Sequence, residues 1–199
     1  MHAAAESAPF RAPDWSLVKT VCLDMDGTVL DLRFDNLFWL EALPRRWGES
    51  RGLDPAAAFA ELKPRFDAKR GTLDWYCIDH WSEELGFDVA ALKLELRGEI
   101  RYLPGADGFL DRLRALGKRV LLTTNAHPIS LAIKNGQTGL AMHFDELVSS
   151  HEFGVPKESP EFWARLARGH GVVPQSTVFV DDSAAVLRAA QDAGVRWIY

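Results

Sequence analysis

The second half of the chain alternates between runs of consecutive apolar residues and amphipathic segments. Four apolar runs lie at 119–125, 146–150, 176–182 and 195–199, of which 146–150 is the weakest. Because these runs are continuous, they predict strands that are covered on both faces, as in parallel sheets flanked by helices. An earlier run that starts at Lys19 is broken at Asp24 and Gly27, which predicts a first strand ending in a tight loop.

The segments between the later runs have apolar residues at helical spacing. One segment carries them at Phe109, Leu110, Leu113 and Leu116 and stops at Gly117, and another at Val186, Ala189, Ala190 and Ala193 and stops at Gly194. Strands that alternate with helices predict an α/β fold with a parallel sheet. In such folds the ligand site lies in the loops at the carboxyl ends of the strands.

Residues 32–103 show helical periodicity and no strand pattern. Asp54 before Pro55 is typical of a helix start, and Asp88 precedes a second amphipathic run. The segment holds 11 of the 21 aromatic residues, enough for a small core of its own. We therefore expect an α/β body at 15–31 and 104–199, a helical insertion at 32–103, and a loose leader at 1–14.

Composition and charge exclude several classes of protein. The chain has 199 residues, 47% of them apolar, and a net charge of −5, which leaves no basic excess for nucleic acid. It shows neither a signal-peptide pattern at its start nor an apolar window long enough to span a bilayer. Two cysteines, Cys22 and Cys77, lie without metal-like spacing, and we expect a reducing, cytoplasmic location.

Two predicted strands end in paired carboxylates. Asp24 and Asp26 follow the first strand, and Asp181 and Asp182 follow the run at 176–182. Such carboxylates repel one another unless a cation lies between them, and oxygen ligands of this kind suit Mg²⁺. Taken one at a time, strand-end aspartates are more often turn or helix caps.

Other strand ends carry groups that suit an anion. Thr124 and Asn125 end the run at 119–125 and can donate hydrogen bonds, and Pro128 just after them fits the start of a helix. Lys157 in a later loop can neutralise a phosphate, although a lone lysine is usually a solvated surface group. The ordered combination with the acidic pairs is far more specific than any single member.

In this order the motifs LDMDGT, LLTTN, the lysine of VPKE, and VFVDDS resemble those of the haloacid dehalogenase superfamily. The resemblance implies a Rossmann-like parallel sheet with a helical type 1 cap inserted between the first two motifs. It implies that the enzyme is a phosphatase that needs Mg²⁺ and no other cofactor, and that it acts on a small phosphate ester.

The same resemblance implies residue roles. Asp24 would be the nucleophile that forms an aspartyl phosphate, and Asp26 the general acid and then base. Lys157 would restrain the nucleophile and hold phosphoryl oxygens. Phosphate contacts would come from Gly27, Thr124, Asn125 and Lys157, and metal contacts from Asp24, Asp26, Asp181 and Asp182. Because an acid on a divalent ion holds a proton poorly, we expect Asp26 to offer the ion its carbonyl and to turn its carboxylate away.

Further stretches, among them LDLRFDN, LDWYCIDHWSE and TTNAHP, resemble the bacterial purine nucleotidases that hydrolyse GMP and IMP. Candidate base contacts are Phe34, Asn36, Trp39, Trp75, Tyr76, Asp79 and His80, and His127 is a candidate either for the rim of the active site or for a helix cap. Aromatic rings can stack on a purine, but most of these are expected to form the core of the insertion. Trp75 and Tyr76 are expected to point in different directions. We expect His151 and His170 at the surface. The resembled nucleotidases continue for a short segment past the position of Tyr199.

Other functions stay open. A dehalogenase needs no metal and no second carboxylate in the first motif, so Asp26 and the Asp181 and Asp182 pair argue against it. A phosphomutase shares the acid and base residue, and a sugar-phosphate or phosphoglycolate-type phosphatase shares all four motifs. A silent binding module with this fold is a further alternative. Oligomeric state is not indicated by the sequence.

Overall fold

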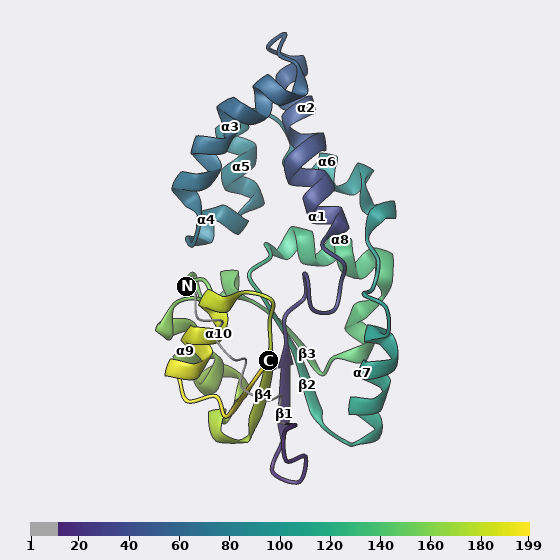
Figure 1. The fold of residues 1–199 in the computed structure, drawn as a ribbon, viewed down its shortest axis with the longest axis vertical. Helices are drawn as coiled ribbons and strands as arrows, with labels where there is room; N and C mark the ends of the chain where they lie inside the picture. Colours follow the sequence, from purple (N-terminus) through teal and green to yellow (C-terminus); the bar gives the residue numbers. More distant parts are fainter. Residues whose placement is uncertain (1–11) are drawn as a thin grey trace, which may run out of the picture.

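The computed structural model describes residues 12–199, so most of the expected leader at 1–14 lies outside the described part. A five-stranded sheet forms its centre (Figure 1). The strands are β1 (Thr20–Leu23), β2 (Arg119–Thr124), β3 (Glu146–Ser149), β4 (Thr177–Val180) and β5 (Trp197–Ile198). All neighbours are parallel, in the order β3-β2-β1-β4-β5, as the continuous apolar runs predict.

Helices cover both faces of the sheet. They are α7 (Ala106–Ala115), α8 (Pro128–Thr138), α9 (Pro160–His170) and α10 (Ala184–Asp192). Alternate strand residues point to opposite faces, so Val21 and Leu23 pack with Leu110 of α7, whereas Cys22 packs with Phe162 of α9 and with Val186 of α10. In Figure 1, α7 lies on one side of the sheet and α9 and α10 on the other.

The helix periodicities hold with one exception. Leu110 and Leu113 are buried in α7, but Leu116 lies just past the helix end and is 54% exposed. Gly117 and Gly194, the expected stops, both have positive φ of 62° and 84°. The apolar stripe thus ends one turn earlier than the sequence spacing indicates.

Residues 33–99, which we call the helical body, contain no strand. Their helices are α1 (Arg33–Leu37), η1 (Phe38–Ala42), α2 (Leu43–Glu49), α3 (Pro55–Lys69), α4 (Leu73–Tyr76), α5 (Ile78–Leu85), α6 (Val89–Glu95) and η2 (Arg97–Glu99). Asp54 and Asp88 cap α3 and α6 by accepting 2.9 Å hydrogen bonds from Ala57 N and Ala91 N. An aromatic core that includes Trp47 and Trp81 holds the helices together.

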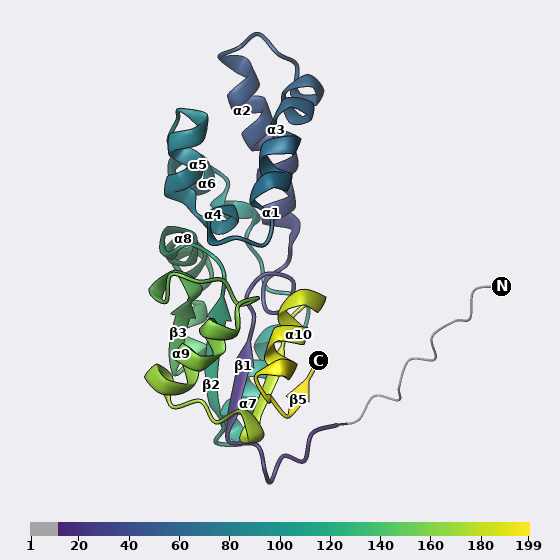
Figure 2. The same ribbon diagram turned by 90° about the vertical axis from the view of Figure 1, so that its left-hand side faces the viewer.

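The helical body lies over the carboxyl edge of the sheet (Figures 1 and 2). Two chain segments lead into and out of it side by side: Asp31 N donates to Arg101 O, and Leu103 N donates to Val29 O, both at 2.9 Å. This position places the helical body above the strand ends that carry the candidate residues. No helix within 12–199 combines the length and apolarity needed to cross a membrane.

Candidate active site

The carboxyl ends of β1, β2 and β4 meet beneath the helical body and form one pocket. Asp24 follows β1 directly, Thr124 ends β2, and Asp181 follows β4. The cavity has a volume of about 240 Å³, and residues of the helical body close its other side. Because the strands are parallel and in register, motifs that are 150 residues apart in sequence come to the same edge.

Lys157 lies at the centre of this group. Its buried ammonium donates to the Asp24 carboxylate, to Asp181 Oδ2 at 2.7 Å and to the carbonyl of Thr123 at 3.0 Å. Burial alone would lower the pKa of Lys157, but the charges of Asp24 and Asp181 raise it above its usual value. The lysine therefore stays charged and binds both carboxylates.

The acidic cluster comprises Asp24, Asp181 and Asp182, whose carboxylate oxygens lie within 4.8 Å of one another. Burial raises the pKa of Asp24 to about 7, assisted by the charges of Asp181 and Asp26 and opposed by Lys157. The pKa of Asp182 is also raised, by burial and by Asp181. Such a cluster favours either protons or a cation, and its oxygen atoms suit a divalent ion.

Gly27 is needed for the close approach of two strand ends. It has φ of 87°, and a Cβ atom at this position would lie 2.4 Å from Asp182 Oδ2. Any side chain would displace the carboxylate from the cluster, and the backbone conformation itself favours glycine. The glycine of the first motif thus positions an acidic residue of the fourth.

Thr124 and Asn125 both line the pocket, but their polar groups are placed differently. Thr124 Oγ1 accepts from Ala126 N at 3.0 Å, so its own proton can still be donated. Asn125 accepts from Lys157 N at 2.8 Å and donates to Glu158 at 2.9 Å. Asn125 therefore holds the loop that carries the lysine.

Asp26 and Asp24 lie in different surroundings. Lys134 Nζ donates to Asp26 Oδ1 at 2.6 Å and to Asp35 Oδ2 at 2.6 Å, and Lys93 donates to Asp35 at 3.3 Å. The Asp26 carboxylate is thus held by an ammonium and lies outside the acidic cluster. Burial raises its pKa against the opposing charge of Lys134.

Lys134, Lys93 and Asp35 were not predicted to belong to the site. The two buried side chains of α8 are both polar: Ser130 and, four residues later, Lys134, which is only 1% exposed. Burial lowers the pKa of Lys93 and would lower that of Lys134, which nearby Asp26 and Asp35 raise instead. The four residues form a buried network between α8, the first motif and the helical body.

The predicted base contacts divide into two groups. Trp39, Trp75 and Tyr76 line the pocket, and the rings of Trp39 and Trp75 stack with centroids 5.7 Å apart and planes 16° apart. Trp75 and Tyr76 both line the pocket, and Trp75 does so although it also packs against the aromatic core of the helical body. Tyr76 Oη also donates to Glu158 at 3.0 Å.

The others do not line the pocket. Phe34 is 1% exposed and packs in the core beneath the ammoniums of Lys93 and Lys134, so its assignment as a base contact is wrong. Asn36 is exposed, and His80 packs edge-on against Trp81. Asp79 and His127 contact each other beside the pocket, 3.6 Å apart.

His151 and His170 are not simple surface residues. The His151 ring is half-buried next to that of His127. His170 contacts Glu146 at 2.6 Å and Glu152 at 3.2 Å, which fixes the end of α9 to the segments around β3. Both side chains have tertiary partners that sequence spacing does not reveal.

Comparison with known proteins shows extensive similarity. The sequence pattern of the haloacid dehalogenase-like hydrolase family matches residues 18–194 of this chain. The GMP/IMP nucleotidase YrfG of Escherichia coli is 44% identical over 183 residues, which cover 92% of this chain and 82% of that protein.

Solved structures of low sequence identity share the fold. A HAD phosphatase from Thermococcus onnurineus superposes with a TM-score of 0.79 at 22% identity, over 92% of this chain and 86% of that one. A HAD family enzyme from Bacteroides thetaiotaomicron, solved with magnesium and inorganic phosphate, has a TM-score of 0.59 at 18% identity, over 92% and 93% of the two chains.

Proposed function

The chain belongs to the haloacid dehalogenase-like hydrolases, and from this premise we propose that it is a Mg²⁺-dependent phosphatase that hydrolyses purine nucleoside 5′-monophosphates. The observation that carries the catalytic part is the buried contact of Lys157 with Asp24 and Asp181 in the lining of one pocket. The observation that supports the substrate is the 44% identity to a GMP/IMP nucleotidase over most of both chains.

Asp24 is the proposed nucleophile. One of its carboxylate oxygens attacks the phosphorus, and the bond from phosphorus to the ester oxygen breaks, which leaves an aspartyl phosphate. The bound Lys157 ammonium restrains the other carboxylate oxygen, so the attacking oxygen keeps a fixed direction. Water then attacks the aspartyl phosphate, which returns the free carboxylate and releases phosphate.

Asp26 is the proposed acid and base. Its raised pKa allows it to hold a proton for the departing ester oxygen, and afterwards it can accept a proton from the attacking water. Lys134 orients this carboxylate and keeps it apart from Asp24. Two carboxylates that are two positions apart in the sequence therefore have different proposed roles in the reaction.

Asp24, Asp181 and Asp182 are the proposed Mg²⁺ ligands, together with the carbonyl of Asp26. Their oxygen donors, and the raised pKa values of Asp24 and Asp182, fit a hard divalent cation. The ion supplies positive charge for the transferring phosphoryl group. Lys157 and the Thr124 hydroxyl, with the backbone at Gly27 and Asn125, would contact the phosphoryl oxygens.

Trp39, Trp75 and Tyr76 form the aromatic side of the same pocket and are the proposed contacts for the nucleobase. A base stacked on an aromatic ring gains about 1–3 kcal/mol. The stacked pair of Trp39 and Trp75 offers a flat surface of this kind opposite the acidic cluster. A cytoplasmic location agrees with the substrate and is proposed with it.

Phosphate release from a panel of esters in the presence of Mg²⁺ tests the proposal. We expect GMP and IMP to be hydrolysed with a kcat/KM well above that of pyrimidine nucleotides, sugar phosphates and phosphoglycolate. A preference for sugar phosphates would replace the nucleotidase with a metabolic phosphatase, and transfer of phosphate to a second sugar hydroxyl would indicate a mutase. Hydrolysis of none of these esters would favour a silent binding module.

A further inference from the structure

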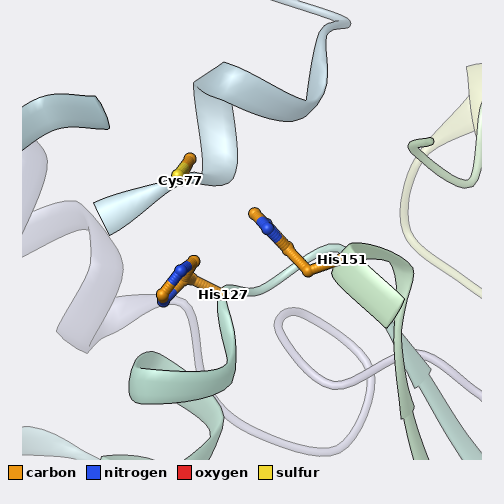
Figure 3. Close-up of side chains that lie close together, drawn as sticks. All are labelled: Cys77, His127 and His151. Carbon is orange, nitrogen blue, oxygen red and sulfur yellow. The ribbon is translucent and has the colours of Figure 1, made fainter. Parts of the chain in front are cut away.

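A second group of metal-binding side chains lies next to the pocket. Cys77 is at the junction of α4 and α5, His127 precedes α8, and His151 follows β3. Their ligand atoms all lie within 4.8 Å of one another. Figure 3 shows the three side chains converging, with Cys77 entering from the helical body and the two imidazoles from the start of α8 and from the short helix after β3.

We propose that Cys77, His127 and His151 bind a zinc-type divalent ion that joins the helical body to the sheet. One thiolate and two imidazoles are ligands that zinc prefers, whereas Mg²⁺ prefers oxygen. The ligand set therefore selects a different ion from the one suited to the acidic cluster. Tetrahedral zinc bonds place ligand atoms about 3.3–3.8 Å apart, so binding would draw the three side chains together by at most about 1.5 Å.

The nitrogen atoms are free to bind. His151 Nε2 is buried and has no hydrogen-bond partner among the described residues. His127 Nδ1 accepts from Ile129 N at 3.3 Å, which leaves Nε2 for an ion. A buried imidazole nitrogen without a partner is unfavourable, and a metal ion would satisfy it.

The remaining groups also favour a cation. Cys77 Sγ lies at the amino end of α5, where it accepts from His80 N at 3.5 Å. The exposed carboxylate of Asp79 lies 3.6 Å from His127 Nε2, within reach of a fourth ligand position.

An ion bound by these three residues would fix the positions of two segments that line the pocket. Cys77 follows Tyr76 directly and His127 is two residues after Asn125, and both Tyr76 and Asn125 line the pocket. A link between them would hold the helical body at a fixed distance from the strand ends. Sequence spacing gives no sign of this site because its ligands are 50 and 24 residues apart.

Zinc binding tests the proposal without reference to any phosphate ester. The full chain, freed of metal with a chelator and then kept in excess Mg²⁺ to fill the acidic cluster, is titrated with zinc against a chromophoric chelator. We expect one zinc per chain, and a loss of zinc affinity of more than about 100-fold in Cys77→Ser and in His151→Gln. His143→Gln, a histidine remote from the cluster, is the matched control and should bind as the unaltered chain does.

Cobalt identifies the ligands directly. Replacement by Co²⁺ should give a thiolate-to-cobalt charge-transfer band and intense tetrahedral visible bands, which disappear in Cys77→Ser and persist in Asp182→Asn. Circular dichroism checks that each variant is folded. If a variant fails to fold, the cobalt spectrum of the unaltered chain decides: without a thiolate band the proposal is wrong.

Thiol reactivity gives an independent measurement. Cys22 is fully buried and burial raises its pKa to about 12, so in the folded chain only Cys77 should react with a thiol reagent. Zinc should slow that reaction at least tenfold. Equal rates with and without zinc, or unchanged zinc affinity in both ligand variants, would overturn the site even if the nucleotidase proposal holds.

Discussion

Asp24 and Asp26, which are two positions apart after β1, bind different lysines. Lys157 holds Asp24, and Lys134 holds Asp26. Both have raised pKa values, but Asp24 shares an acidic cluster with Asp181 and Asp182, whereas Asp26 shares Lys134 with Asp35. These surroundings, and not the position in the sequence, distinguish the proposed nucleophile from the proposed acid.

Asp24→Asn tests the nucleophile. The amide has nearly the same shape but cannot attack phosphorus, so we expect kcat to fall by at least about 10³-fold while circular dichroism is unchanged. Asp192→Asn, an exposed aspartate at the end of α10, is the control and should retain full activity. Retained turnover in Asp24→Asn would place the nucleophile elsewhere.

Lys134→Met tests the buried network. The substitution keeps the length of the side chain but leaves Asp26 and Asp35 without their shared ammonium, and breaking a buried pair costs about 3–5 kcal/mol. We expect the free energy of unfolding in urea to fall by about 3 kcal/mol and kcat to fall with it. Lys63→Met removes only the exposed pair with Asp67 and should change the free energy of unfolding by less than about 0.5 kcal/mol.

At the scale of elements, α4 decides what the helical body presents to the pocket. It has only four residues, and two of them, Trp75 and Tyr76, line the pocket. Adjacent residues of a helix point about 100° apart, so both can border one cavity from different directions. The irregular end of the helical body therefore carries the candidate specificity residues.

Trp75→Leu tests the stacking role. If Trp75 contacts the base, KM for GMP should rise about tenfold or more, while KM for a small ester such as phosphoglycolate should change less than twofold. Leu116→Ala, an exposed position on the opposite side of the sheet, serves as the control. Equal changes for all esters would indicate that Trp75 only packs against Trp39.

The link between β3 and α9 predicts a pH effect on stability. Hydrogen bonds from His170 and Arg119 lower the pKa of Glu146 below 4.5. Because the folded chain holds this carboxylate ionised more strongly than the unfolded chain does, the stabilisation is present above pH 4.5 and is lost as the pH falls through the lowered pKa.

Urea unfolding of Glu146→Gln between pH 3 and pH 7 measures this effect. The side chain is 38% exposed, so the loss near pH 7 should be below about 1 kcal/mol and should vanish at low pH. Glu83→Gln, on the exposed surface of α5, should show no such pH-dependent difference. A difference that grows toward low pH would have the wrong sign.

At the scale of the whole molecule, a few polar contacts connect the helical body to the sheet across the pocket. Tyr76 Oη donates to Glu158, and Lys134 of α8 binds Asp35 of α1. Glu158 is in turn held by Asn125, next to the lysine of the third motif. The closed arrangement thus depends on residues that also build the site.

Tyr76→Phe removes the first of these contacts. A hydrogen bond to a charged group contributes about 1.5–3 kcal/mol, so KM should rise about tenfold for nucleotides and small esters alike. Steady-state kinetics on both ester classes check this result, with Tyr102→Phe as a control outside the pocket. A change confined to nucleotides would mean that the hydroxyl reads the base instead.

The sequence by itself determined the sheet and the chemistry at its edge. Continuous apolar runs predicted the strands, and motifs placed directly after them predicted that Asp24, Thr124, Asp181 and Asp182 would meet. This works because each motif is attached to its own strand and parallel strands end at the same edge. The helix starts at Asp54 and Asp88 were likewise predicted correctly, because a capping residue and the helix that it begins are neighbours in the sequence.

Only the tertiary structure decided which side chains meet between the helical body and the sheet. The burial of Phe34, the network around Lys134, and the convergence of Cys77 with His127 and His151 depend on the rotation of helices and on how two bodies dock. Periodicity shows which face of a helix is apolar but not which partner that face will contact. Contacts between segments that fold around separate cores are set by docking, and no local spacing in the chain encodes them.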